Sequence, residues 1–359
     1  MARVFNFGAG PAVLPVEVLE EAQKELVDFA GSGMSLLEHS HRGKEYDAVH
    51  QEAIANLTKL LNLSSDYFVL FLQGGASMQF AMVPMNLLGQ GQTADYINSG
   101  AWADKAVKEA KLIGNVNVAA NTSKEIPTRV PKIEECKLTK GAAYVHLTSN
   151  ETIAGSQWKS FPRTESPLVA DMSSDFLSRP FDAGQFGLIY AGAQKNLGPA
   201  GAAVVIMRKD LAERVGEKVP TMLKYKTHIA ENSLYNTPPC FTIYTIMLVT
   251  RWIQKMGLQE LYRRNVDKAG RLYAAIDGSG GYYRGTAVKE CRSDMNVTFR
   301  LPSEALEETF VKEASRQKLK GLKGHRSVGG IRASIYNAFP VEGVDALVSF
   351  MKDFQKKNG

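Results

Sequence analysis

Two ionisable residues follow apolar runs that have the character of buried strands. Asp171 ends the run Leu168–Asp171, and Lys195 comes shortly after the run Gly187–Ala191. Ligands of open α/β sheets bind outside the carboxyl ends of the strands, where both residues are expected. Lys195 stands among alanine, glycine and leucine, and an amine in such surroundings has a lowered pKa and forms Schiff bases with aldehydes. A surface lysine and a helix-capping aspartate are the ordinary alternatives.

A glycine-rich turn contributes a second kind of chemistry. The strand predicted at Tyr67–Leu72 leads into Gly74, Gly75, Ala76 and Ser77. Small residues there let backbone N–H groups approach an anion, and the following helix directs the positive end of its dipole at the same point. Neither GxGxxG nor GxxxxGK[ST] occurs in the chain, which disfavours a dinucleotide or a nucleoside triphosphate. A tight turn without a ligand stays open as an alternative.

An anion cradle, a lysine and a carboxylate are together the three groups that pyridoxal phosphate requires. The cradle takes the phosphate and the lysine takes the aldehyde. A carboxylate opposite the pyridine nitrogen keeps that nitrogen protonated, so that the ring accepts electrons from a carbanion. The sequence therefore predicts a pyridoxal phosphate site with Lys195 and Asp171 as its catalytic residues.

The elements that must position these groups alternate between helix and strand from about residue 15 to 210. Apolar residues at helical spacing predict one helix from Pro15 through Leu26 to Phe29 and a second from Tyr46 to Leu61. Near-continuous apolar strands between helices indicate an α/β fold whose mostly parallel sheet is covered by helices on both faces. The predicted strands are 67–72, 93–98, 116–119, 143–148, 168–171, 187–191 and 202–207.

Beyond residue 240 the order of elements changes to that of a smaller α+β unit. We expect a large cofactor-binding domain over residues 16–260. The small domain comprises residues 261–359 together with the N-terminal segment 1–15, and no long linker separates the two. Helices are predicted at 241–256, 258–276, 303–319 and 341–356, and strands at 295–301 and 331–336.

The composition is that of an ordinary globular protein with a small positive charge. Of the 359 residues, 44 % are hydrophobic and 22 % are charged. The 43 Lys and Arg against 37 Asp and Glu give a net charge of +6, which fits an anionic small substrate or weak nucleic-acid contact and alone decides neither. Cys136, Cys240 and Cys291 form no CxxC pair, which favours a reducing compartment over a disulfide framework or a zinc site. Without an apolar run of about 18 residues or a signal-peptide pattern, we expect a cytoplasmic protein that does not contact membranes.

Seven sequence segments make the chain similar to a known family nearly from end to end. It resembles the phosphoserine aminotransferases, class V members of the aspartate-aminotransferase fold of pyridoxal phosphate enzymes. Each motif is modest alone, but the set in this order is highly specific. The segments are Asn6–Ala12, His39–Arg42, Gly74–Ser77, Asn98–Trp102, Ala193–Gly201, Tyr235–Pro239 and His325–Arg332.

The resemblance implies roles for individual residues in holding the cofactor. Lys195 carries the aldehyde, and Trp102 stacks on the ring, although an ordinary core tryptophan is its alternative. Asn236 and Thr237 reach the phosphate from a partner subunit, so the family pattern implies a homodimer. Some members carry an arginine where this chain has Ser77, so neighbouring residues must hold the substrate anion. The implied cofactor-binding set is Ala76, Ser77, Trp102, Thr152, Asp171, Gln194, Lys195, Asn236 and Thr237.

A basic run between Glu313 and Glu342 contains no acidic residue. A solvated basic face is its ordinary interpretation. Arg332, however, follows two glycines and opens a predicted strand, and an arginine fork grips a carboxylate through two hydrogen bonds. Arg332 therefore fits an anchor for a substrate α-carboxylate. The family pattern adds sites for the substrate phosphate or the glutamate side chain at His41, Arg42, His325 and Arg326.

The expected activity is transamination between L-glutamate and 3-phosphohydroxypyruvate, which gives O-phospho-L-serine and 2-oxoglutarate in L-serine biosynthesis. Other acceptors, glyoxylate or a phosphorylated hydroxythreonine, are the main alternative.

A cysteine desulfurase using Cys291 does not fit the family's motifs. A nucleic-acid binder using residues 316–332 is disfavoured because that run lacks interleaved aromatics. A metal site at His39 and His41 is disfavoured because the other histidines lack ligand spacing. The small molecules of this reaction and a second copy of the chain are the expected partners.

Overall fold

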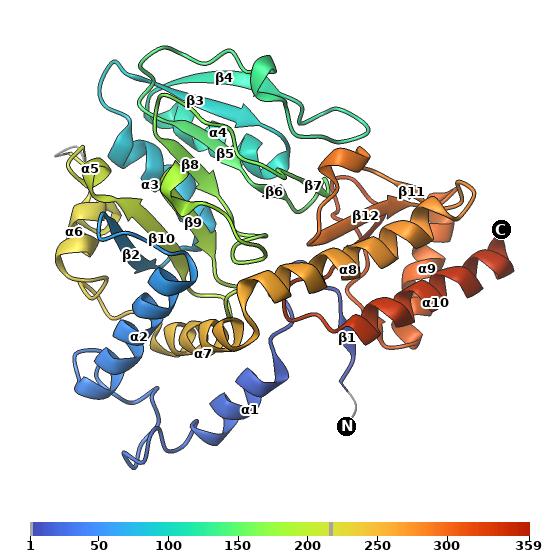
Figure 1. Ribbon diagram of the computed structural model, residues 1–359, viewed down its shortest axis with the longest axis horizontal. Coiled ribbons are helices and arrows are strands. Elements are labelled where there is room, and N and C mark those ends of the chain that lie inside the picture. Colours follow the sequence, from blue (N-terminus) through green and yellow to red (C-terminus); the bar gives the residue numbers. More distant parts are fainter. Residues whose placement is uncertain (1–2, 215–217) are drawn as a thin grey trace.

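A seven-stranded sheet forms the centre of the computed structural model, which describes residues 3–214 and 218–359 (Figure 1). Its strand order is β2-β10-β9-β8-β5-β3-β4. Neighbouring strands are parallel except that β10 is antiparallel to both β2 and β9. The predicted, mostly parallel sheet is confirmed. The strands are β2 (Tyr67–Leu72), β3 (Thr93–Asn98), β4 (Asn115–Asn121), β5 (Val145–Thr148), β8 (Leu168–Asp171), β9 (Phe186–Gly192) and β10 (Ala203–Arg208).

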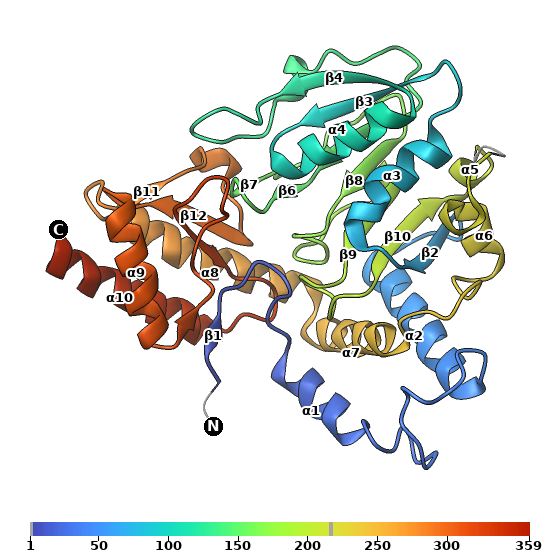
Figure 2. The ribbon, with the colours of Figure 1, turned by 180° about the vertical axis from the view of Figure 1, so that it is seen from behind.

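Helices cover both faces of this sheet because its strands are apolar on both sides. In β10, Val204 and Ile206 join one hydrophobic cluster, whereas Val205 and Met207 join the other, as the period of two along a strand requires. The first cluster includes residues of α2 (Lys44–Leu60) and α7 (Cys240–Met256). The second includes residues of α3 (Gly75–Leu87) and α4 (Ala101–Ile113), which lie in front of the sheet in Figure 2.

A third hydrophobic cluster surrounds a three-stranded antiparallel sheet, β11-β12-β14, on the other side of the molecule (Figure 1). Phe5 and Phe7 belong to it, because β1 pairs in parallel with β13 and the Phe7 and Phe339 rings lie 4.4 Å apart. Residues 1 and 2 of the predicted segment 1–15 lie outside the described residues. The elements are β1 (Phe5–Asn6), β11 (Arg284–Gly285), β12 (Asn296–Arg300), β13 (Leu319–Lys320), β14 (Ile331–Ser334), α8 (Leu258–Asp277), α9 (Glu304–Arg316) and α10 (Val341–Asn358).

Short elements connect these layers. A two-stranded hairpin, β6 with β7, lies beside the carboxyl end of β5 in the chain, and single 3-10 turns occur at four places. The short elements are α1 (Val16–Lys24), β6 (Asn150–Glu151), β7 (Ser156–Gln157), α5 (Lys209–Ala212), α6 (Tyr225–Ala230), η1 (Ile133–Glu135), η2 (Ala183–Gln185), η3 (Thr221–Leu223) and η4 (Lys289–Cys291).

Two predicted helices end earlier than their apolar spacing indicated. The first stops at Lys24, because a turn in which the Phe29 N–H bonds the Met34 carbonyl returns the Phe29 ring to the core, 5.7 Å from Tyr244. The helix predicted to reach residue 319 stops at Arg316. Lys318 has a left-handed φ of 64°, and Leu319 pairs with a strand instead. In both cases the last apolar residue, Phe29 or Leu319, makes a tertiary contact outside the helix. Its spacing had predicted that it would continue the helix.

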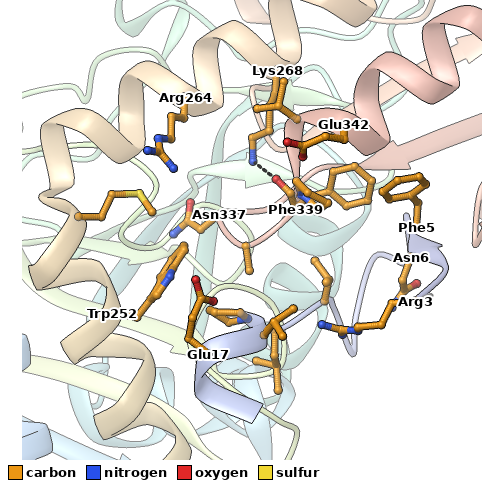
Figure 3. A pocket seen from close by; sticks show the side chains of 18 of the residues that line it. Arg3, Phe5, Asn6, Glu17, Trp252, Arg264, Lys268, Asn337, Phe339 and Glu342 are labelled. Atoms are coloured by element: carbon orange, nitrogen blue, oxygen red, sulfur yellow. Dashed lines mark hydrogen bonds between the residues drawn. The ribbon is translucent and has the colours of Figure 1, made fainter. Parts of the chain in front are cut away.

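A cavity of about 400 Å³ lies between α7, α8, the N-terminal segment and the turn after β14 (Figure 3). At its edge the buried Lys268 ammonium donates to the carbonyls of Ile335, Tyr336 and Phe339 at 3.0, 2.7 and 3.2 Å. This turn also carries Asn337, whose N–H donates to Asn196 Oδ1 at 3.0 Å. Lys268 therefore fixes a turn that contacts the residue directly after Lys195.

A buried histidine in the sheet makes stability depend on pH. His146 of β5 stacks on Tyr96 and shares a 2.8 Å hydrogen bond with the Tyr190 hydroxyl, and burial lowers its pKa to about 3. The unfolded chain binds a proton near pH 6.5 and the folded chain does not, so stability is full above pH 6.5 and falls as the pH drops toward 3. Between pH 6.5 and 5 the expected loss is about 2 kcal/mol.

Thermal unfolding of the wild type and of His146→Gln across this range checks the prediction. Glutamine keeps a polar partner for Tyr190 but does not titrate, so its Tm should fall less between pH 7 and 5. Parallel Tm curves for the two proteins would contradict the assignment.

No helix in the described residues combines the length and the apolar character that crossing a membrane needs.

Candidate active site

Asp171 and Lys195 come together at the carboxyl ends of neighbouring strands. Asp171 ends β8, is buried, and accepts a hydrogen bond from the Ser173 N–H at 2.9 Å through Oδ1. Lys195 follows β9, is half-buried, and donates from Nζ to Thr152 Oγ1 at 3.1 Å. Thr152 itself is buried in the turn after β6. The arrangement follows from parallel pairing of β8 with β9, which sets both strand ends at one edge of the sheet.

The charges of these two residues act on each other. Burial lowers the pKa of Lys195, against the opposing effect of the Asp171 and Glu151 carboxylates, and the Arg332 guanidinium lowers that pKa further. Burial raises the pKa of Asp171, and the Lys195 ammonium opposes this change. A buried amine with a lowered pKa is the form of lysine that suits nucleophilic and general-base chemistry.

The glycine turn presents the N-terminus of α3 to the same region of the fold. Gly74 has a φ of +82°, and a Cβ there would lie 2.6 Å from the Met78 Cβ, so the turn requires glycine. Ala76 and exposed Ser77 occupy the first turn of the helix, where backbone N–H groups have no partner within the helix. No acidic residue stands in that turn. The structure places the segment predicted to hold an anion at a helix N-terminus, and its role as an anion cradle stays a prediction.

Trp102 stands at the second position of α4, with its ring facing the lysine. Lys195 Nζ lies 5.3 Å from the centre of the indole, and Lys105 Nζ lies 4.1 Å from it. Trp102 Nε1 is buried and has no hydrogen-bond partner. Trp102 is partly buried and packs against the second hydrophobic cluster, and its role at the cofactor stays a prediction.

The N-terminal segment covers the loop that carries Lys195. The Ala12 N–H donates to the Gln194 carbonyl at 2.9 Å, and the Tyr336 hydroxyl donates to the Ala9 carbonyl at 2.8 Å. The N-terminal segment therefore holds the backbone of Gln194, the residue before Lys195, in place.

Arg332 and His325 face a cleft of about 330 Å³ that also touches Gly100. Arg332 lies on β14, and its half-buried guanidinium has an Nε without a hydrogen-bond partner. Burial lowers the pKa of Arg332 and, with no carboxylate acting on it among the described residues, the guanidinium is available for an incoming anion.

Several cations converge on His325. Burial lowers the pKa of His325, and the charges of Arg332, Arg326 and Lys105 lower it further. Arg326 is exposed and lines a neighbouring depression with Glu304 and other residues. His325 and Arg332 are thus brought together in one cleft, and Arg326 lines the neighbouring depression.

The remaining predicted residues form a separate group within the chain. Arg42 Nη2 donates to the Leu234 carbonyl at 3.4 Å, and His41 precedes it in the turn before α2. Asn236 Nδ2 donates to Gln73 Oε1 at 3.3 Å, beside the glycine turn. Thr237 accepts from Gln73 Nε2 at 2.9 Å through its carbonyl. In residues 3–214 and 218–359, no hydrogen bond joins these four residues to Lys195 or Arg332. The substrate-binding role of His41 and Arg42, and the role of Asn236 and Thr237 in a partner's site, stay predictions.

Sequence reasoning missed Glu151 and Lys105. Glu151 accepts hydrogen bonds from α4 across 48 and 49 residues of sequence, and no spacing rule reveals such a contact. Lys105 stands three residues after Trp102 on one helix, and helical spacing would have placed the two side by side.

The rival metal site is not assembled in the described residues, which contain no group of three or more His, Cys, Asp or Glu side chains suited to an ion. His39 instead pairs with Ser32 at 2.9 Å and with Glu45 at 3.7 Å.

Comparison with known proteins assigns this arrangement to a family. The family model described as Aminotransferase class-V matches residues 4–347. The phosphoserine aminotransferase of Niallia circulans is 57% identical over 359 residues, covering 99% of both chains, and that of Geobacillus kaustophilus is 56% identical over 358 residues with the same coverage.

Solved structures agree with these sequence matches. The phosphoserine aminotransferase from Bacillus circulans subsp. alkalophilus superposes with a TM-score of 0.96 at 56% identity, covering 99% of each chain. The pyridoxal phosphate-bound phosphoserine aminotransferase from Trichomonas vaginalis gives 0.94 at 42% identity, covering 98% of this chain and all of the other. The chain therefore belongs to the phosphoserine aminotransferase family of class-V aminotransferases.

Proposed function

We propose that this aminotransferase uses pyridoxal phosphate to exchange an amino group between L-glutamate and 3-phosphohydroxypyruvate. The products are O-phospho-L-serine and 2-oxoglutarate, and the pathway is L-serine biosynthesis. The observation that carries the proposal is the meeting of Lys195, Asp171 and Trp102 beside Arg332, which has no carboxylate partner among the described residues, in a chain that is 57% identical to a phosphoserine aminotransferase.

The residues at the site fit pyridoxal phosphate. The α3 N-terminus with Ser77 suits the phosphate, the Asp171 carboxylate suits a pyridinium, and Trp102 offers an indole face. The orphaned Nε1 of Trp102 adds a free donor at the site. The full set that would hold the group is Ala76, Ser77, Trp102, Thr152, Asp171, Gln194 and Lys195, with Asn236 and Thr237 from the partner subunit.

Bound there, the cofactor supplies an electron sink that stabilises negative charge at the substrate Cα. Lys195 Nζ removes the Cα proton as the general base, and its lowered pKa favours the free amine that this step needs. Thr152 Oγ1 accepts a hydrogen bond from Nζ and so orients the amine. Lys195 Nζ would then give this proton to the C4′ carbon of the cofactor. In the second half of the cycle, Lys195 would make the same two proton transfers in the reverse order.

Arg332 holds the α-carboxylate that both substrates share. Its guanidinium has no carboxylate partner among the described residues and lies close enough to Lys195 to lower the lysine's pKa. His325, Arg326, His41 and Arg42 are the proposed contacts for the distal anion, the phosphate of one substrate or the side-chain carboxylate of the other.

The proposal includes a homodimer with an active site at the subunit interface. Support comes from large apolar side chains that are exposed in the single chain near the segments concerned: Val27 is 80 % exposed, Leu37 60 % and Tyr235 45 %. Sedimentation should give twice the chain mass. A fully active monomer would contradict this part.

Domain boundaries and location also stay within the proposal. The third hydrophobic cluster joins residues of segment 5–13 to those of 269–354, which supports a small domain of residues 1–15 and 261–359 beside a large domain of 16–260. Three cysteines without disulfides support a reducing compartment, the cytoplasm.

A panel of half-reactions tests the proposed substrates. Rapid mixing of the holoenzyme with O-phospho-L-serine, L-serine, L-alanine and L-glutamate gives kcat/KM for each donor. O-phospho-L-serine should exceed L-serine by at least about 100-fold, because a cationic site recognises its phosphate. Equal constants for these two donors would overturn the proposed substrate, and a preference for alanine with glyoxylate would favour the alternative acceptor.

A further inference from the structure

The helix that carries Trp102 begins without a cap of its own. An α-helix normally binds its first free N–H groups through the side chain of its N-cap residue, and here that residue is Gly100. The cap comes instead from Glu151 in the β6–β7 hairpin. Glu151 Oε2 accepts from the Trp102 N–H at 3.0 Å, and Oε1 accepts from the Ala103 N–H at 2.9 Å.

The fit between Gly100 and Glu151 is close. A Cβ on Gly100 would lie 2.5 Å from the Glu151 Cδ, so only glycine leaves room for the carboxylate. Glu151 is fully buried, and its own carbonyl accepts from the Gly155 N–H at 2.8 Å, which closes the hairpin. Both carboxylate oxygens are therefore held on a rigid turn and directed at α4.

The next residue in the chain holds the lysine. Thr152 accepts the hydrogen bond from Lys195 Nζ, and that nitrogen lies 5.3 Å from the centre of the Trp102 ring. Two consecutive residues therefore position the two groups. Glu151 binds the backbone of Trp102, and Thr152 binds the amine of Lys195.

We propose that Glu151 is a positioning residue for the cofactor site: by capping α4 it holds the Trp102 ring in the position in which the indole would stack on a cofactor bound at Lys195. The inference rests on the proposed function, because a stacked ring is what the indole would support. A glutamine cannot replace the carboxylate, since it offers one acceptor oxygen for two N–H donors.

Burial opposes a negative charge on Glu151, whereas the amides at the N-terminus of α4 favour one. Burial raises the pKa of Glu151 to about 7, against the two amide hydrogen bonds, and Asp171 raises it further while Lys195 lowers it. Burying an unpaired carboxylate costs free energy. At Glu151 the helix N-terminus and the Lys195 charge offset part of that cost.

The test compares the wild type with Glu151→Gln, and with Asp95→Asn as the matched control. Asp95 is likewise a buried carboxylate that accepts a backbone N–H, from Thr139 at 2.6 Å, but it stands at the start of β3 and not at the catalytic edge. The cofactor is removed with hydroxylamine, and each apoprotein is titrated with pyridoxal phosphate. Hydrogen exchange then follows the Trp102 and Ala103 amides in the apoproteins.

Glu151→Gln should bind pyridoxal phosphate about tenfold more weakly, the factor that corresponds to one lost charge-assisted hydrogen bond. The Trp102 and Ala103 amides should exchange faster, and the visible circular dichroism of the bound cofactor should change. Asp95→Asn should match the wild type in all three measurements even if its Tm falls. Unchanged affinity, exchange and dichroism in a folded Glu151→Gln protein would overturn the inference.

Two further outcomes keep this result separate from the proposed function. If the wild type takes up no pyridoxal phosphate, the proposed function fails, while the exchange measurement still reports whether Glu151 fixes α4. If Glu151→Gln does not fold, Gly100→Ala serves in its place, because the added methyl must displace the Glu151 carboxylate. The same weakening is expected there, and wild-type binding by Gly100→Ala would contradict the inference.

Discussion

Lys195→Ala is expected to lower kcat by more than about 10⁴-fold, because one side chain supplies both the covalent link to the cofactor and the general base. The fold should survive, since the single side-chain hydrogen bond described for Lys195 Nζ goes to Thr152. Single-turnover kinetics with O-phospho-L-serine measure the loss, and near-ultraviolet circular dichroism checks the fold.

Lys105→Ala is the matched control for this experiment. Lys105 Nζ is also close to the Trp102 ring, at 4.1 Å, but its side chain is exposed. Its removal should change kcat by less than about tenfold, because a solvated cation contributes little to a proton transfer. Near-normal turnover in Lys195→Ala would refute the base assignment. Equal losses of kcat in both variants would show that Lys195 acts only through its positive charge, as Lys105 does.

Arg332→Leu is expected to weaken both half-reactions, by about 100-fold or more in kcat/KM for each substrate. The guanidinium is half-buried and has no carboxylate partner among the described residues, and a buried charge pair with a substrate carboxylate costs several kcal/mol to break. L-alanine should lose as much as O-phospho-L-serine, since the two share only the α-amino acid group.

Arg326→Leu separates the anchor from the distal site. Arg326 is exposed, lines a depression next to the cleft and is the proposed contact of the distal anion, so its loss should affect O-phospho-L-serine more than L-alanine. A rise in KM for one substrate alone in Arg332→Leu would show that Arg332 does not bind a shared carboxylate.

Much of the fold could be predicted because its strands are buried on both faces. Three strands were predicted with the observed bounds, namely Tyr67–Leu72, Thr93–Asn98 and Leu168–Asp171. An apolar run that stops at polar or glycine residues leaves little choice for where the strand begins and ends. The antiparallel direction of β10 could not be predicted, because an apolar run carries no mark of its direction.

The candidate site divides in the same way. The sequence could predict that Lys195 and Asp171 lie near each other, because the carboxyl ends of parallel strands meet at one edge of a sheet, a rule that needs only local sequence. Glu151 was not found, because its role depends on a helix that begins about fifty residues earlier. The roles of His41 and Asn236 stay predictions, because Asn236 would act across the proposed dimer interface and His41 would contact a substrate, and a single chain tests neither.

The central claim is that residue 195 carries the cofactor, and one measurement tests it most directly. The purified holoenzyme is reduced with borohydride and digested, and its peptides are weighed. The account predicts a phosphopyridoxyl group on Lys195 and on no other lysine. A colourless protein whose Lys195 peptide keeps its unmodified mass after reduction would contradict it.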